Sequence, residues 1–252
     1  MSFVVAIPSY NRVETLRAKT LFLLAKYSIP KELITIFVAN TEEEALYKAG
    51  IPENLYGSIV VGVKGLMEQR NFIDEYYPLG THIVYFDDDV TEIVILKNGS
   101  LEPITSLLNL IYKGFQECVS HGYNLWGVSA VPNGFFMKDV IHTNLKFIPG
   151  WFYGIINRRI RLVLSYKGTT LAYKEDYQRS LQNAVLDGGV IRFSFVAAKT
   201  TIGAKGGLNT KVMDRLEMNR LACRFLMETY PGLVRLNPKR DGEVLLARRV
   251  SK

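Results

Sequence analysis

The first ninety residues alternate between short apolar segments and segments with apolar residues at helical spacing. The apolar, β-branched segments cover Phe3 to Tyr10, Leu33 to Asn40, Gly57 to Val63 and the run that ends at Phe86, and this composition is typical of buried strands. Strands separated by helices form a largely parallel sheet with helices on both faces, and ligands collect at the carboxyl ends of the strands. The sequence therefore predicts an α/β fold whose site lies at that edge.

The second half of the chain is less regular. It contains an amphipathic helix over residues 104–122, a strand that ends at Pro132, and an aromatic-rich stretch over residues 133–157 that we expect to mix strands and loops. A loop leading into a helix (residues 169–189), a strand (190–200) and a basic helix (211–228) follow. Because no break in composition separates the halves, residues 1–252 are predicted to form a single domain.

Composition narrows the class of protein. No run of 18 residues is both apolar and uncharged, and no leader-like N-terminus is present, so we expect a soluble, cytoplasmic protein without an integral membrane segment. Cys118 and Cys223 lie far apart in helical-looking segments, which favours packing thiols over a disulfide or a zinc site. A net charge of +7 favours a polyanionic partner, whether nucleic acid, a nucleotide-linked substrate or an acidic membrane surface.

Three consecutive aspartates, Asp87 to Asp89, follow the fourth apolar strand directly. Carboxylates this close repel one another, and a strand end is partly desolvated, so the cluster costs stability unless it shares a cation. Asp87 and Asp89 have the spacing to hold a hard divalent ion, Mn²⁺ or Mg²⁺, which would bind a diphosphate. The alternative is that the carboxylates cap a turn or face water, and the triplet alone does not choose.

Four short motifs, taken together, resemble a known family. They are "IPSYNR" at the end of the first strand, Asn40 at the end of the second, "KGLMEQRN" before the acidic strand and "FDDD" at its end. Their order and spacing are similar to those of nucleotide-sugar glycosyltransferases with the GT-A fold. More narrowly, residues 61–90 are similar to the TET/JBP-associated glycosyltransferases of phage and other viral genomes, whose proposed acceptors are hydroxymethylated pyrimidines in DNA. The resemblance is good across residues 3–96, moderate near 147–209 and poor beyond.

This resemblance implies a Rossmann-like, mixed but mainly parallel sheet flanked by helices. Residues 1–100 would bind the nucleotide sugar, and residues 101–252 would bind the acceptor. The implied donor-binding residues are Pro8, Ser9, Tyr10, Arg12, Asn40, Lys64, Gly65, Arg70, Asp87 and Asp88.

Each donor residue has a chemical role and a plainer alternative. Tyr10 can stack on a base and Arg12 can approach a phosphate, although an ordinary strand–helix turn with a solvated arginine explains both. Asn40, or the Thr41 beside it, can bind the base edge, and a helix N-cap explains "NTEEEA" equally well. Gly65 permits close backbone approach at a helix start, where Arg70 or Lys64 adds positive charge; the alternative is a capped surface helix.

The metal ligands implied by the resemblance are Asp87 and Asp89. Many GT-A enzymes add a late histidine as a third ligand, but no histidine follows His142 in this chain. The remaining coordination positions would then fall to diphosphate and water, which suits Mn²⁺ or Mg²⁺.

The catalytic base and the acceptor site are expected in the second half. Glu175 and Asp176 precede a predicted helix. In inverting GT-A enzymes a Glu-Asp pair in the corresponding position carries the catalytic base, so Asp176 is the candidate and Glu175 is the next choice. The alternative is that both acids favour the dipole of a helix's first turn. Trp151, Phe152 and Tyr153 are the expected acceptor-binding aromatics, with core packing as the alternative.

Basic segments add weaker candidates. Asn157 to Arg161 can meet a phosphate backbone, and Lys205 to Asn209 can form a lid over the diphosphate. The C-terminal cations can contact nucleic acid or form a solvated tail; they are Lys239, Arg240, Arg248, Arg249 and Lys252.

The sequence predicts a metal-dependent glycosyltransferase that uses a nucleoside-diphosphate sugar, most simply a UDP-sugar. The preferred acceptor is a 5-hydroxymethylpyrimidine in DNA, and a glycan, polysaccharide or glycoprotein is the alternative. A nucleotidyltransferase or phosphatase would want a glycine-rich loop or a nucleophilic aspartate at the first strand, where this chain has Pro8 to Tyr10. A non-catalytic nucleic-acid-binding module would leave "FDDD" and "KED" unexplained, because exposed acids weaken phosphate binding.

Overall fold

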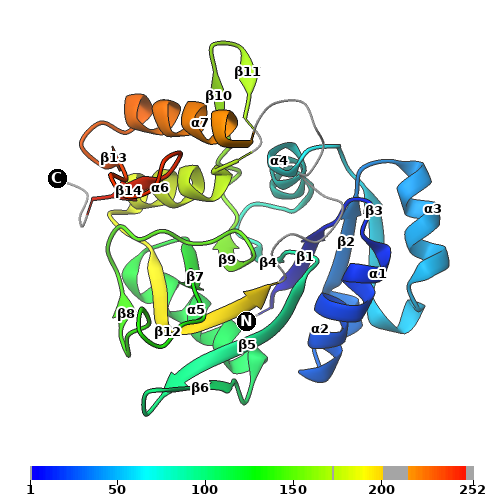
Figure 1. Cartoon of the computed structure of the whole chain (residues 1–252). Helices are drawn as coiled ribbons and strands as arrows, with labels where there is room; N and C mark the ends of the chain where they lie inside the picture. The colour runs from blue at the N-terminus through cyan, green and yellow to red at the C-terminus, as the bar shows by residue number, and fades with distance from the viewer. Residues whose placement is uncertain (1, 172, 201–214, 248–252) are drawn as a thin grey trace.

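A single mixed sheet runs through the whole molecule (Figure 1). The computed structural model describes residues 2–171, 173–200 and 215–247. The ten-stranded sheet has the order β3-β2-β1-β4-β9-β7-β12-β5-β6, with β8 paired to β12. Its first four strands are parallel: β1 (Val4–Pro8), β2 (Ile34–Val38), β3 (Ser58–Val61) and β4 (His82–Phe86).

Antiparallel strands enter the sheet beyond β4. The remaining strands of the main sheet are β5 (Val90–Lys97), β6 (Ser100–Pro103), β7 (Leu125–Ser129), β8 (Ile141–His142), β9 (Phe152–Ile156) and β12 (Ile191–Thr200). Strand β9 runs antiparallel between β4 and β7, while β12 runs parallel to β7 and antiparallel to β5. Two small hairpins lie apart from this sheet, β10 (Ser165–Tyr166) with β11 (Thr169–Thr170) and β13 (Val234–Leu236) with β14 (Val244–Leu246).

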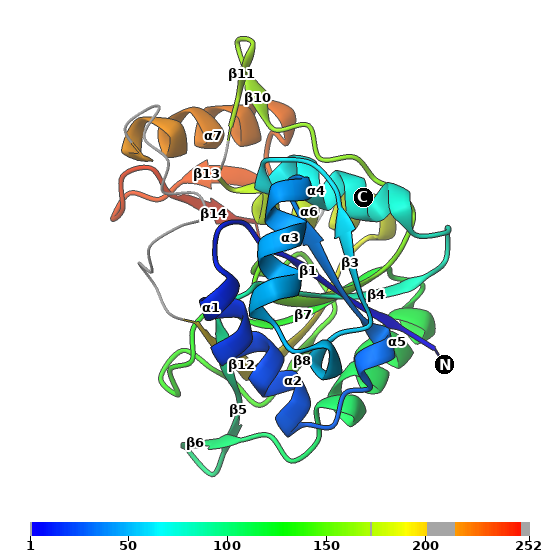
Figure 2. The ribbon, with the colours of Figure 1, turned by 90° about the vertical axis from the view of Figure 1, so that its right-hand side faces the viewer.

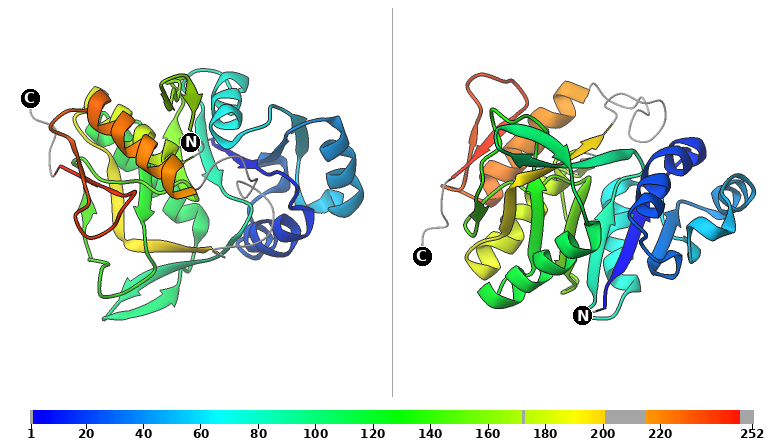
Figure 3. Two further views of the ribbon diagram at one scale, coloured as in Figure 1. Left: turned by 45° about the horizontal axis from the view of Figure 1, so that its top comes forward. Right: turned by 90° about the horizontal axis from the view of Figure 1, so that it is seen from below.

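Helices cover both faces of the sheet. They are α1 (Val13–Leu16), α2 (Phe22–Lys26), α3 (Thr41–Gly50), α4 (Leu66–Tyr76), α5 (Leu107–His121), α6 (Glu175–Asp187) and α7 (Arg215–Thr229), with a π-helical segment (Arg17–Leu21) between α1 and α2. Helices α1, α2, α3 and α5 pack in one buried cluster, and α4, α6 and α7 pack in the other. Figure 2 shows α4, α6 and α7 above the sheet and α1, α2 and α5 below it, and Figure 3 gives two further views of these layers.

The strand periodicity decides which side chains reach each face. On β4, Val84 and Phe86 belong to the cluster under α5, while Ile83 and Tyr85 belong to the cluster under α4 and α6. Strand β9 alternates in the same way, with Phe152 on the first face and Tyr153 on the second. The acidic triplet, which follows β4, therefore lies between the two helical layers that cover the sheet.

The predicted fold class and element pattern are confirmed. Each strand and helix expected in the first half is present within a few residues of its expected bounds, and α5, β7, α6, β12 and α7 match the segments expected in the second half. The β5–β6 hairpin was not predicted, although its turn, Asn98–Gly99, carried a readable signal. Both residues have positive φ angles, 50° and 81°, and an Asn-Gly pair is a preferred two-residue hairpin turn. None of the described helices is long and apolar enough to span a membrane.

Phe152 provides a test of the packing between the two halves. Its side chain is fully buried, with ring centroids 4.5 Å from Phe86 and 5.5 Å from Trp126. We expect Phe152→Ala to lower the free energy of unfolding by about 3–5 kcal/mol, because it leaves a cavity in this cluster. Urea unfolding followed by circular dichroism measures the change. Phe135→Ala, at a ring that is 86% exposed, is the control, and equal effects of the two substitutions would contradict the packing described here.

Candidate active site

The main chain of the acidic triplet is held by the residue before β9 and by the π-helical segment between α1 and α2. The Asp87 amide donates to the Trp151 carbonyl at 3.0 Å, across from β9. The buried Thr20 hydroxyl donates to the Asp87 carbonyl at 2.7 Å and accepts from the Val90 amide at 3.0 Å. These contacts fix the turn between β4 and β5, so the directions of the three carboxylates are set by the fold.

Asp88 points back toward the loop after β1. Its Oδ2 accepts from the Ser9 hydroxyl at 2.7 Å, and its Oδ1 accepts from Nη1 of Arg12 at 2.6 Å. The Ser9 hydroxyl also lies 2.7 Å from the Tyr47 hydroxyl, and Asp88 is 4% exposed. Ser9 and Asp88 thus hold the β1 loop against the triplet. Because both carboxylate oxygens of Asp88 are paired with protein groups in this conformation, the expected contacts of Ser9 and Asp88 with the donor stay predictions that require these pairs to open.

Asp87 and Asp89 face the open side of the turn. Oδ1 of Asp87 lies 3.0 Å from Nη2 of Arg70, and Oδ2 of Asp89 lies 3.4 Å from Nη2 of Arg12. The pKa of Asp87 is raised to about 7. Burial is the largest cause, Asp89 and Asp88 act in the same direction, and Arg70 opposes the shift. Burial likewise raises the pKa of Asp88 to about 6 and that of Asp89 above its ordinary value. The site therefore holds more carboxylate charge than its two arginines neutralise.

This donor set fits a hard divalent cation. Within the described residues Oδ2 of Asp87 receives no hydrogen bond, and the Asp87 side chain is 31% exposed. Carboxylate oxygens at a strand end are the ligands that Mn²⁺ and Mg²⁺ prefer. In the same residues no third His, Cys, Asp or Glu joins the pair to complete a three-ligand group. An ion would therefore bind through Asp87 and Asp89 and take its other ligands from substrate and water.

Arg70 is buried rather than directed at a ligand. From the inner face of α4 its Nη1 donates to the Tyr153 hydroxyl at 2.9 Å, and its Nη2 donates to the Gly150 carbonyl at 3.0 Å as well as to Asp87. Its Nε lies 3.3 Å from Oε1 of Glu175, and the residue is 1% exposed. Burial disfavours the charged form, but Tyr153, Asp87 and Glu175 outweigh it and raise the pKa of Arg70. In this conformation protein groups enclose the guanidinium, so the expected contact between Arg70 and the donor stays a prediction that requires these pairs to open.

Glu175 and Asp176 begin α6 on the far side of Arg70. Glu175 is 6% exposed and paired with Arg70, whereas Asp176 is half-buried and forms no ion pair within the described residues. Burial and the neighbouring Glu175 raise the pKa of Asp176 to about 7, with Arg179 opposing. A general base is most effective when its pKa lies near the working pH. Of the two acids, Asp176 therefore has the better properties for accepting a proton.

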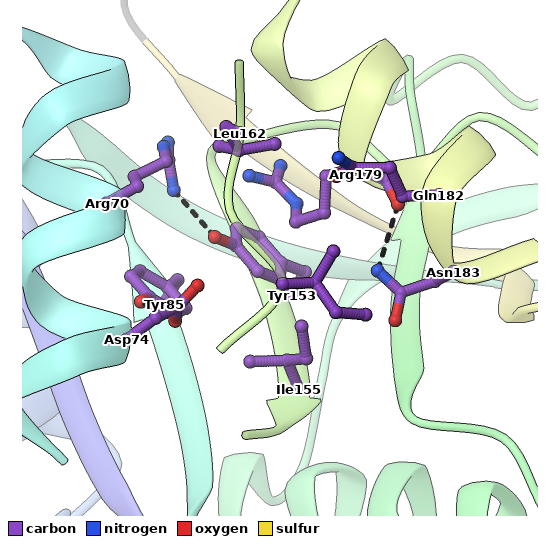
Figure 4. A pocket seen from close by; sticks show the side chains of 10 residues that line it. Arg70, Asp74, Tyr85, Tyr153, Ile155, Leu162, Arg179, Gln182 and Asn183 are labelled. Atoms are coloured by element: carbon purple, nitrogen blue, oxygen red, sulfur yellow. Dashed lines mark hydrogen bonds between the residues drawn. The ribbon is translucent and has the colours of Figure 1, made fainter. Parts of the chain in front are cut away.

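A buried polar layer lies behind Arg70 and lines a small cavity (Figure 4). Tyr153 stands between two arginines, with Arg70 at its hydroxyl and the Arg179 guanidinium 3.8 Å from its ring centroid. Tyr153 also stacks on Tyr85 at 4.8 Å, and the Tyr85 hydroxyl donates to Asp74 at 2.7 Å. Asp74 and Arg179 were not predicted as site residues from the sequence. The spacing of Arg179 four residues after Glu175, which puts both on one helix face, was the available signal.

Tyr10, Lys64 and Gly65 form an open corner beside the triplet. The Lys64 ammonium lies 5.4 Å from the Tyr10 ring centroid, and Gly65 begins α4 with a φ of 107°. Lys64 and Gly65 are exposed and Tyr10 is half-buried, so solvent reaches all three residues. These three positions remain predicted donor residues.

Pro8 and Asn40 have structural roles. Pro8 is buried as the last residue of β1, in register with Phe37. Oδ1 of Asn40 accepts from the Glu43 amide at 2.8 Å and caps α3. Oδ1 of Asn40 is thus used by the helix, while the residue is exposed, and its contact with a base edge stays a prediction.

The three predicted acceptor aromatics separate in the structure. Trp151 is half-buried beside Asp87, and its Nε1 has no hydrogen-bond partner among the described residues. Phe152 and Tyr153 are 0% and 1% exposed, because β9 is a central strand covered on both faces. They cannot meet an acceptor directly, so that part of the expectation is wrong and only Trp151 remains. Residues 205–209 and the cations Arg248, Arg249 and Lys252 lie outside the described residues.

Comparison with known proteins adds to this geometry. No protein-family model matches the sequence, and no curated protein matches it. Solved structures do match: residues 1–349 of S. aureus TarS in complex with UDP-GlcNAc (TM-score 0.55, 15% identity) align over 90% of this chain and 67% of that one. The mannosyltransferase PcManGT from Pyrobaculum calidifontis, in complex with GDP-Man and Mn²⁺, aligns with a TM-score of 0.53 and 11% identity over 90% and 63%.

A third match is GalNAc-T7 with UDP, GalNAc and Mn²⁺, at a TM-score of 0.52 and 11% identity over 90% of this chain and 48% of that one. The chain thus spans between 48% and 67% of the length of these three structures. At such low identity the likeness concerns the fold, and the fold is that of GT-A glycosyltransferases.

Asp74 gives a pH-dependent test of the buried polar layer. Burial raises its pKa to about 6, against about 4 for an unfolded aspartate. Between these values the folded state retains a proton that the unfolded chain has released, so this group makes stability fall as pH rises from about 4 to about 6. Asp74→Asn, whose side chain can still accept from Tyr85, is expected to remove that part of the dependence. Urea unfolding at intervals across this range measures it, and parallel curves for the two proteins would contradict the assignment.

Proposed function

We propose that this protein is a metal-dependent glycosyltransferase that moves a sugar from a nucleoside-diphosphate sugar, a UDP-sugar in the simplest case, to a hydroxyl group. The observation that carries the proposal is the link that Arg70 makes between Asp87, at the end of β4, and Glu175, which lies next to Asp176 at the start of α6, on a GT-A fold. The neighbouring structures in complex with UDP-GlcNAc, UDP or GDP-Man support the donor class.

In this proposal Asp87 and Asp89 hold Mn²⁺ or Mg²⁺, which when bound offsets the negative charge of the departing diphosphate. Two neighbouring structures contain Mn²⁺, which supports this choice of ion. The corner formed by Tyr10 and Lys64 offers an aromatic face for the base and a cation for a phosphate. Arg12 acts by holding Asp88 and Asp89, because its guanidinium is already paired with both.

Asp176 is the proposed general base of a transfer that inverts the anomeric configuration. It accepts the proton of the acceptor hydroxyl while that oxygen bonds to the anomeric carbon, and the bond from this carbon to the diphosphate oxygen breaks. Glu175 is 6% exposed and its Oε1 is paired with Arg70, so it is the less accessible of the two acids. Much of the rate gain would come from holding donor and acceptor together.

The proposed acceptor is a 5-hydroxymethylpyrimidine in DNA. The net charge of +7, the similarity of residues 61–90 to the TET/JBP-associated glycosyltransferases, and the half-buried Trp151, whose carbonyl accepts from the Asp87 amide, support it. In the same proposal the first hundred residues bind the donor, the rest bind the acceptor, and the protein acts in the cytoplasm of the cell that holds the DNA.

Metal binding tests the first part of the proposal. We expect wild-type protein to bind Mn²⁺, and Asp87→Asn and Asp89→Asn each to weaken binding by at least about tenfold, because each removes a ligating carboxylate. The loss of the electron paramagnetic resonance signal of free Mn²⁺ during a titration measures the affinity. Asp139→Asn changes an exposed aspartate in the loop after β7 and serves as the control. Equal affinities for all four proteins would contradict the site.

Transfer assays test the reaction and the acceptor. Labelled UDP-sugars are incubated with Mn²⁺ and three acceptors: DNA containing 5-hydroxymethylcytosine, the same DNA unmodified, and oligosaccharides. We expect label on the modified DNA alone. Label on oligosaccharides alone would support the glycan alternative, and no label or donor hydrolysis with any nucleotide sugar would contradict a glycosyltransferase.

Asp176 sets the expected pH dependence of this transfer. Its pKa of about 7 means that the base is mostly protonated below that pH, so the rate should rise as pH increases through about 7. Asp176→Asn should lower the rate by about 10²-fold or more while leaving Mn²⁺ affinity within a few-fold of wild type. An Asp176→Asn enzyme with wild-type turnover would exclude this residue as the base.

A further inference from the structure

We infer that Arg70 is a positioning residue that joins the metal-binding carboxylate Asp87 to the acidic pair of α6, by holding Asp87 and Glu175 on one buried guanidinium. This inference rests on the proposed function, and it assigns Arg70 to protein carboxylates instead of the donor.

The guanidinium of Arg70 contacts protein groups on every side, including the Gly150 carbonyl at 3.0 Å from Nη2. At 1% exposure its guanidinium is enclosed, with Nη2 at 3.0 Å from Asp87, Nη1 at 2.9 Å from the Tyr153 hydroxyl and Nε at 3.3 Å from Glu175. The two carboxylates it connects are 88 positions apart in the sequence, one at the end of β4 and the other at the start of α6. Arg70 is thus a direct side-chain link between the donor half and the acceptor half.

The link directs Asp87 toward an ion. Arg70 occupies Oδ1 of Asp87, while Oδ2 receives no hydrogen bond from the described residues and the side chain is 31% exposed. A second protein group on one oxygen of a ligating carboxylate fixes its orientation, and removing such a partner typically costs about 10–100-fold in metal affinity. Arg70 also places a positive charge between Asp87 and Glu175, which would otherwise repel each other.

Only an arginine can hold Asp87 and Glu175 in this way. A guanidinium presents its N–H groups in a planar fork and can address two carboxylates, a hydroxyl and a carbonyl at once, whereas a lysine ammonium is a single point of charge. Lysine at this position keeps the charge and loses the simultaneous contacts. The comparison between arginine and lysine therefore separates positioning from charge.

Two neighbouring residues fit the same function. A Cβ atom added to Gly150 would lie 3.1 Å from Oε1 of Glu175 and 3.2 Å from Nη2 of Arg70, so a side chain there would push the pair apart. Behind Tyr153, the Arg179 guanidinium stacks on the ring at 3.8 Å and holds the tyrosine so that its hydroxyl meets Arg70. Arg70, Gly150 and Tyr153 thus form one buried support under Asp87.

Mn²⁺ titration followed by electron paramagnetic resonance of the free ion tests the inference without reference to turnover. We expect Arg70→Lys to weaken Mn²⁺ binding by about 10–100-fold. Gly150→Ala changes no charge, but its methyl group would displace Arg70 and Glu175. It should therefore weaken Mn²⁺ binding by at least about fivefold. Circular dichroism and thermal unfolding verify that each variant is folded, and Tyr153→Phe replaces Arg70→Lys if the latter does not fold.

The matched control is Arg158→Lys. Arg158 binds both oxygens of Asp187 on α6, at 2.7 and 3.0 Å, away from the triplet, and its replacement should leave Mn²⁺ affinity within twofold of wild type. Wild-type or tighter Mn²⁺ binding by folded Arg70→Lys and Gly150→Ala proteins would overturn the inference. Failure of the wild-type protein to bind Mn²⁺ would instead contradict the metal site of the proposed function.

Discussion

The burial of carboxylates at the end of β4 is the constraint on which the rest of the site depends. Asp87, Asp88 and Asp89 follow a central strand, where burial raises the pKa of each. Two arginines offset part of this charge: Arg12 from the β1 loop pairs with Asp88 and Asp89, and Arg70 from α4 pairs with Asp87. The fold brings Arg12 to the triplet because the carboxyl ends of β1 and β4 lie side by side in a parallel sheet, and Arg70 reaches it from α4.

The compensation remains incomplete, and this gives the site its chemistry. Arg70 is shared with Glu175, so the carboxylates around it outnumber the positive charges. A divalent ion at Asp87 and Asp89 would supply the missing charge and at the same time bind a diphosphate. The buried carboxylate charge that lowers the stability of the protein alone therefore suits this region to an ion that carries a nucleoside-diphosphate sugar. The position of Asp176 one residue after Glu175 puts a group with a pKa of about 7 beside that region.

Much of the fold was readable from the sequence because the first half follows simple periodicities. Apolar segments and helical spacing located β1 to β4 and α3 to α4, and the acidic triplet located the site edge. The antiparallel insertion of β9 between β4 and β7 was not readable, since strand order depends on contacts between segments about seventy residues apart.

The roles of single residues were harder to predict than the position of the site. Arg70, Ser9 and Asp88 were expected at the donor. In the structure Ser9 binds Asp88 and Arg70 binds Asp87, and these pairings depend on burial and side-chain direction rather than on residue type. Phe152 and Tyr153 were misjudged for a related reason, because an aromatic triplet looks alike in sequence whether its strand is central or at an edge. Tyr10, Lys64 and Trp151 keep enough exposure to meet a ligand.

The central claim is that Asp87 and Asp89 share one divalent ion while Arg70 keeps its contact with Asp87. A crystal structure of the protein with Mn²⁺ and a nucleoside-diphosphate sugar, with anomalous scattering measured at the manganese edge, tests it most directly. The account predicts one manganese peak bonded to Oδ2 of Asp87, to an oxygen of Asp89 and to the diphosphate, with Nη2 of Arg70 still on Oδ1 of Asp87. A peak elsewhere, or bound diphosphate with both aspartates paired only to arginines, would contradict it.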